Sequence, residues 1–125
     1  MSDKKKILVV DDEPTHLFCA KEILEAEGYE VVLHPRAFGA TEKVMTENPD
    51  LVLLDVNMPA LSGETLVMLL RGRKQTSGAR VLLYSSNEED ALRRSALRLG
   101  LGADGFVAKG DPQMLREAVG RALAA

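Results

Sequence analysis

An unbroken run of four large apolar residues, Leu51 to Leu54, leads directly into the carboxylate of Asp55. A run of this length without alternation is typical of a strand that is buried on both faces, as in a parallel sheet. Pro59 and Gly63 then mark a loop. The sequence therefore predicts that Asp55 lies at the carboxyl end of a central strand, where open α/β sheets form their ligand crevice.

Strand-like and helix-like patterns alternate along the whole chain, which predicts a doubly wound α/β fold with a five-stranded parallel sheet. The expected strands are residues 6–10, 29–33, 51–55, 81–84 and 106–108. The expected helices are residues 14–27, 37–47, 63–70, 88–99 and 112–123. Right-handed crossovers place helices on both faces. We expect strand order 2-1-3-4-5, with the alternating second strand at an edge.

Composition indicates one domain, residues 1–125, with 46% hydrophobic and 28% charged residues. The net charge of -3 argues against direct nucleic-acid binding. No apolar run approaches the ~18 residues of a membrane span, so no membrane partner is expected. The single cysteine, Cys19, cannot form an internal disulfide and suits a buried position in a reduced cytosol. We therefore expect a cytoplasmic protein.

Acidic residues follow two strands that should be neighbours in this sheet. Asp11 and Asp12 follow the first strand, and Asp55 ends the third. Three carboxylates in one crevice repel one another, and a hard cation such as Mg²⁺ relieves this repulsion. Lys109 after the fifth strand would add a positive charge, and Ser85 after the fourth would add a hydroxyl donor. Such groups suit phosphoryl transfer to a carboxylate.

Four motifs, taken together and in this order, resemble the receiver domain of bacterial two-component response regulators. They are Val9–Glu13, Leu53–Pro59 with Gly63, Ser85, and Gly105–Lys109. The resemblance covers the chain from the first strand to the last helix. It implies a flavodoxin-like, CheY-like (βα)5 fold, with Mg²⁺ as the cofactor and Asp55 as the phosphoacceptor.

The resemblance also implies a role for each further site residue. Asp11, Asp12, Asp55 and the backbone carbonyl of Asn57 would hold the Mg²⁺ ion; Ser85 and Lys109 would contact the phosphoryl group; Ser85 and Phe106 would form the switch; Asn57 and Asn87 would tune dephosphorylation. Two positions depart from the family pattern. Phe106 replaces a frequent tyrosine, and Gly110 replaces the usual proline after the lysine. A cis bond without proline costs about 2.5–4 kcal/mol, so we expect a trans Lys109–Gly110 bond.

The function implied by the resemblance is a signalling switch, not an enzyme. A sensor histidine kinase or a phosphotransfer protein would donate the phosphoryl group. The fourth helix, fifth strand and fifth helix would then act on a downstream protein target, and a homodimer through the same surface is consistent with the family. The chain ends after its last helix, so we expect either a stand-alone regulator or one domain of a longer protein.

The alternative function is that of a Mg²⁺-dependent phosphohydrolase on a related sheet. Such enzymes often place a nucleophile and a general acid on one loop as an acid-x-acid pair. Here the first-strand acids, Asp11 and Asp12, are adjacent, and the expected nucleophile is alone on the third strand. The short chain also leaves no room for an insertion that gates a substrate.

Several other residues are expected to have structural roles. His16 and His34 lack metal-ligand spacing and are predicted to be surface or packing residues. Asp111 before Pro112 predicts an N-cap for the last helix. Leu69 and Met114 are expected on the buried stripes of their helices.

Overall fold

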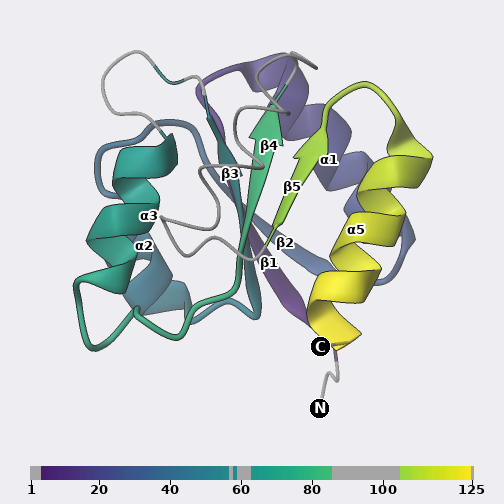
Figure 1. Ribbon diagram of the computed structural model, residues 1–125. Helices are drawn as coiled ribbons and strands as arrows, with labels where there is room; N and C mark the ends of the chain where they lie inside the picture. Colours follow the sequence, from purple (N-terminus) through teal and green to yellow (C-terminus); the bar gives the residue numbers. More distant parts are fainter. Residues whose placement is uncertain (1–3, 57, 59–62, 86–104, 125) are drawn as a thin grey trace.

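A parallel sheet with helices on both faces forms the fold (Figure 1). The computed structural model describes residues 4–56, 58, 63–85 and 105–124. Its strands are β1 (Lys6–Val10), β2 (Glu30–His34), β3 (Leu51–Asp55), β4 (Val81–Ser85) and β5 (Gly105–Ala108). Its helices are α1 (Pro14–Ala26), α2 (Ala40–Glu47), α3 (Gly63–Arg71) and α5 (Pro112–Ala124). In these ranges, no helix has the length and hydropathy that crossing a membrane requires.

The strand order is β2-β1-β3-β4-β5, and every neighbouring pair is parallel. This confirms the predicted fold class, with β2 at an edge. Val10 of β1 pairs with Leu54 of β3, so the residues that follow them, Asp11 and Asp55, lie together at the carboxyl ends of these two neighbouring strands. The helix expected over residues 88–99 lies outside the described part of the chain.

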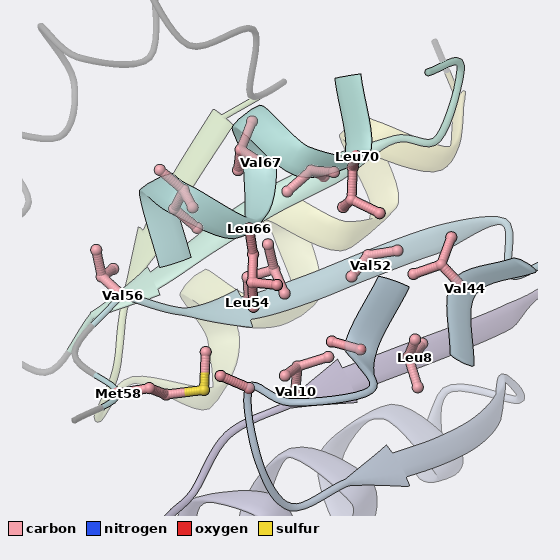
Figure 2. Close-up of a cluster of buried hydrophobic side chains, with 14 residues drawn as sticks. Leu8, Val10, Val44, Val52, Leu54, Val56, Met58, Leu66, Val67 and Leu70 are labelled. Atoms are coloured by element: carbon pink, nitrogen blue, oxygen red, sulfur yellow. The ribbon is translucent and has the colours of Figure 1, made fainter. Parts of the chain in front are cut away.

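Two hydrophobic cores fill the two faces of the sheet, because successive side chains of a strand point to opposite faces. Leu8 and Val10 pack with α2 and α3, as Figure 2 shows. Ile7 and Val9 pack with α1 and α5 on the other face. All five residues of β3 are buried, as expected for a strand covered on both faces. Each fully buried Leu or Val contributes about 1.5–3 kcal/mol relative to an exposed one.

The second helix begins at Ala40, three residues later than the predicted Ala37. Gly39 precedes it in the left-handed conformation, with φ of 80°, so the helix cannot extend back through this residue. The other end agrees with the prediction: Asn48 is a left-handed C-cap whose N–H donates to the Val44 carbonyl at 2.9 Å.

Three side chains predicted to be buried are exposed instead, namely Cys19, Leu69 and Met114. The buried residues of these helices are Leu17, Ala20 and Leu24 in α1, Leu66, Val67 and Leu70 in α3, and Leu115, Ala118 and Val119 in α5. Each helical residue turns about 100° from the previous one. An error of one position in the expected stripe is therefore enough to bring a side chain to the surface.

The connection from α3 to β4 is closed by a buried hydrogen bond. The hydroxyl of Thr76 donates to the Leu70 carbonyl at 2.6 Å, and Thr76 is only 1% exposed. This short bond adds to the one that the same carbonyl, near the end of α3, accepts from the N–H of Arg73 at 3.4 Å.

We expect Thr76→Val to lower the free energy of unfolding by about 1–2 kcal/mol, because valine keeps the shape and removes the donor. Urea denaturation measures this change. The control is Ser77→Ala, since the Ser77 hydroxyl is exposed and donates to Lys74 at 3.3 Å. Equal stability of the Thr76→Val variant and the wild type would contradict the assignment.

Candidate functional site: an acidic crevice at the carboxyl edge of the sheet

Three carboxylates meet at the edge where β1 and β3 end. Asp11, Asp12 and Asp55 each offer an oxygen, and these three atoms lie within 4.8 Å of one another. Asp11 and Asp55 are buried, with exposed fractions of 0% and 4%, whereas Asp12 is exposed. The topology thus brings together the acids that the sequence placed at two strand ends, and it leaves one side open to solvent.

Backbone hydrogen bonds fix Asp11 at the end of β1. Its N–H donates to the carbonyl of His34 on β2 at 3.2 Å. Its Oδ1 accepts the N–H of Glu13 at 2.9 Å, which closes a turn just before α1. The other oxygen, Oδ2, is directed toward Lys109.

Lys109, directly after β5, brings a positive charge into the crevice. Its Nζ donates to Asp11 Oδ2 at 2.7 Å and lies 3.3 Å from Asp55 Oδ1. The Lys109 side chain is only 7% exposed, so this ammonium is held mainly by protein groups. One ammonium cannot balance three ionised carboxylates, and the remaining negative charge favours a further cation.

Burial raises the pKa of Asp11 above its ordinary value, and the negative charge of Asp55 acts in the same direction. The hydrogen bonds from Lys109 and Glu13 and the positive charge of Lys109 act in the opposite direction. The net rise means that ionised Asp11 is held at a cost in the folded chain.

An aromatic ring contacts the same ammonium from the α1/α5 face. Lys109 Nζ lies 5.1 Å from the ring centroid of Tyr84, within the range of a cation–π interaction. Burial raises the pKa of Tyr84 to about 12, and the negative charge of Asp11 adds to this rise. Tyr84 therefore remains a neutral phenol at physiological pH.

His16 contacts this cluster, an interaction that the prediction of a surface or packing residue did not include. Its Nδ1 lies 2.8 Å from Lys109 Nζ and 3.6 Å from Asp11 Oδ2. His16 lies in the first turn of α1, a helix that begins right after the acidic end of β1. That position was a usable signal. By contrast, Nε2 of the half-buried His34 contacts only the nearby Phe38 carbonyl in the described structure, at 2.7 Å.

The remaining predicted site residues lie at other places or outside the described residues. Phe106 on β5 is half-buried and packs against the core that β3 shares with α3. Ser85 ends β4 and its backbone pairs with Ala108, but its side chain lies outside the described part. Asn57 and Asn87 also lie outside it.

The loop after Lys109 contains Gly110, the residue that departs from the family pattern. Gly110 has φ of 106°, and all peptide bonds in the described residues are trans, as expected for Lys109–Gly110. Asp111 is the predicted cap: its Oδ1 accepts the N–H groups of Gln113 at 3.0 Å and Met114 at 3.4 Å.

A family model described as the response regulator receiver domain matches residues 7–120. Among curated proteins, the chain is 38% identical over 105 residues to the alkaline phosphatase synthesis transcriptional regulatory protein PhoP of Bacillus subtilis. That alignment covers 84% of this chain and 42% of the relative, so the chain spans about two fifths of the length of that protein.

Solved structures show the same fold. The chemotaxis protein CheY4 of Vibrio cholerae superimposes with a TM-score of 0.86 at 26% identity, covering 96% of this chain and 99% of that one. A sensor histidine kinase receiver domain from Pseudomonas aeruginosa, described with magnesium coordinated in its active-site cleft, has a TM-score of 0.85 at 21% identity. The alignment with that domain covers 98% of this chain and 99% of that one.

We expect substitutions of Gly110 to destabilise the fold, even when they introduce the proline that is usual in relatives. A φ of 106° is strained for any residue with a Cβ and inaccessible to proline. Gly110→Ala should cost about 1–2 kcal/mol and Gly110→Pro more, measured by urea denaturation. Gly120→Ala is the control, because Gly120 lies within α5 with open space around its Cα. A more stable Gly110→Pro variant would contradict the assigned conformation.

The raised pKa of Asp11 predicts how stability depends on pH in a chelator. Wild type and Asp11→Asn both carry a neutral side chain below the ordinary pKa of 3.8. As pH rises from there through the higher folded-state pKa, the wild type loses the stability associated with the neutral carboxyl. The variant should therefore gain stability relative to wild type across this window and then level off. Urea titrations at a series of pH values measure the difference in free energy of unfolding between the variant and the wild type. A difference that does not change with pH would refute the raised pKa of Asp11.

Proposed function

Because the chain belongs to the family of response regulator receiver domains, we propose that Asp55 is the phosphoacceptor of a Mg²⁺-dependent phosphorelay step. The observation that carries this proposal is the position of Asp55. It lies nearly buried at the end of β3, 3.3 Å from the ammonium of Lys109 and beside two further carboxylates. We propose that residues 1–125 form one domain, which serves two-component signalling. The family match does not favour the alternative function of a phosphohydrolase.

The proposed chemistry is a simple displacement at phosphorus. A carboxylate oxygen of Asp55 forms a bond to phosphorus while the bond from phosphorus to the donor breaks, and the donor leaves with the electron pair. The donor atom is a histidine nitrogen in a kinase or phosphotransfer protein, or an oxygen in a small acyl phosphate. Lys109 faces the oxygen of Asp55 and offsets negative charge as the phosphoryl group arrives.

The donor set of the crevice fits magnesium, since three carboxylates offer hard oxygen ligands within a short span. When bound, the ion would neutralise charge on the transferred group and on the acids. We propose that Asp11, Asp12, Asp55 and the backbone carbonyl of Asn57 hold it. The magnesium described in the cleft of the Pseudomonas aeruginosa domain supports this proposal.

The proposed response starts from Ser85 and Lys109, which would contact the phosphoryl group. Ser85 and Phe106 would then carry the change, since the half-buried ring of Phe106 packs at the margin of a core and can move further inward. Asn57 and Asn87 would set the lifetime of the phosphorylated form.

Receiver domains act between histidine kinases and downstream effectors. For this chain we propose a sensor histidine kinase or phosphotransfer protein as donor and a downstream protein as target. The target would be reached through β5, α5 and the helix expected over residues 88–99, which lie outside the described part of the chain. We also propose that the chain forms a homodimer through that surface and lies in the cytoplasm. The domain itself is proposed to make no contact with nucleic acid. Relatives such as PhoP extend well beyond the matched region.

Intact-protein mass spectrometry tests the phosphoacceptor. After treatment with a small acyl phosphate and Mg²⁺, we expect the wild type to gain one phosphoryl group and Asp55→Asn to gain none. A chelator should abolish the gain. Asp50→Asn is a matched control, because Asp50 is exposed at the opposite end of β3 and should not affect the reaction. Phosphorylation that survives in Asp55→Asn, or that needs no divalent cation, would refute the proposal.

A further inference from the structure

We infer that His16 is a positioning residue for phosphoryl transfer, because its ring nitrogen holds the ammonium of Lys109 over the crevice. This inference rests on the proposed function of Asp55. It concerns a residue that does not touch the reacting carboxylate and acts through Lys109.

The ammonium of Lys109 has three N–H donors and three acceptors around it. These are Asp11 Oδ2 at 2.7 Å, His16 Nδ1 at 2.8 Å and Asp55 Oδ1 at 3.3 Å. The Tyr84 ring lies on a further side at 5.1 Å. Since the lysine side chain is only 7% exposed, these groups replace most of its hydration. His16 and Asp11 thus hold the ammonium through hydrogen bonds, and Asp55 adds an ion-pair contact.

His16 differs from the other two acceptors in charge and in role. Asp11 and Asp55 are anionic and belong to the proposed metal and phosphoryl sites, so a bound cation or phosphoryl group competes with Lys109 for their oxygens. Since the Lys109 ammonium can only donate, the contact assigns the acceptor role to His16 Nδ1, which is an uncharged nitrogen in the tautomer that carries its proton on Nε2. Its hydrogen bond can therefore persist when the carboxylates take other partners, and the ammonium stays beside Asp55.

The backbone beneath His16 is rigid, which suits a positioning role. Pro14 starts α1, the N–H of Leu17 donates to the Glu13 carbonyl at 3.1 Å, and Leu17 is buried in the core. A cavity of about 390 Å³ adjoins the ring, with Cys19, Ile23 and Tyr84 in its lining. The ring therefore has space to turn away, and we attribute its orientation to the bond with Lys109.

Two substitutions separate positioning from a merely structural role. His16→Ala removes the acceptor and favours the helix, whereas His16→Asn restores an acceptor near the place of Nδ1 but has the lower helix propensity. If His16 only stabilised α1, the alanine variant would perform at least as well as the asparagine variant. If it positions Lys109, the order is reversed. Thr15→Ala, an exposed change in the same turn, is the matched control.

The kinetic experiment measures phosphorylation by a small acyl phosphate at about pH 8, where free imidazole is neutral. At saturating Mg²⁺, we expect the rate constant to fall about tenfold in His16→Ala, as for the loss of one hydrogen bond to a charged group. His16→Asn should recover most of that loss, and Thr15→Ala should react like the wild type. Equal rates in wild type and His16→Ala, or equal losses in the alanine and asparagine variants, would overturn the inference.

A second measurement needs neither metal nor phosphate. The ¹H–¹⁵N NMR signal of the Lys109 ammonium should be visible in the wild type and in His16→Asn, because its protons are held in hydrogen bonds, and should broaden or shift in His16→Ala. An unchanged signal in His16→Ala would overturn the inference about His16 but would leave the proposed function of Asp55 intact. A wild type that accepts no phosphoryl group would instead overturn the proposed function and the kinetic role built on it, while the NMR result would still report whether the contact exists.

Discussion

The ion pair between Lys109 and Asp11 allows an acidic crevice to exist in a folded sheet. Burying two carboxylates, with exposed fractions of 0% and 4%, costs free energy that a nearby positive charge offsets. The charge comes from the far end of the chain, 98 residues from Asp11, and crosses the carboxyl ends of β3 and β4 to reach it. The crevice is thus a property of the completed sheet, and no isolated segment contains it.

The ion pair between Lys109 and Asp11 stabilises the site but compensates only part of its negative charge. Lys109 compensates part of the negative charge, but the pKa of Asp11 stays raised because burial outweighs the stabilising contacts. A divalent cation that binds only the folded chain would add stability by mass action. The negative charge of the three acids exceeds the positive charge of Lys109, and this excess favours binding of a cation. The effect follows from the burial of Asp11 and Asp55 as much as from the number of acids.

Sequence reasoning succeeded where a local pattern and a topological rule were sufficient. The apolar run of β3 predicted a buried strand. The strand order 2-1-3-4-5 then predicted that Asp11 lies beside Asp55, and no side-chain conformation was needed for this prediction. It failed where rotation about a helix axis decides the outcome. Cys19 and Met114 are exposed because periodicity locates a stripe only to about one residue, which is 100° of rotation. The start of α2 depends on the left-handed Gly39, which composition alone does not specify. The contact of His16 with Lys109 joins the first turn of α1 to the residue after β5, and it depends on a side-chain orientation that the position of His16 in the sequence indicates only weakly.

The separation of the interior into two cores has a consequence for how such a chain can change over time. One core lies between the sheet and α2 and α3, the other between the sheet and α1 and α5, and among the described residues they have no buried side chain in common. Substitutions at sites more than about 10 Å apart that share no partners usually combine additively, to within about 0.3–0.5 kcal/mol. Phe106 packs on one side and Tyr84 on the other, although they occupy neighbouring strands. Substitutions deep in one core, such as at Val44 of α2, can therefore accumulate with little effect on distant positions of the other core, such as Leu24 of α1.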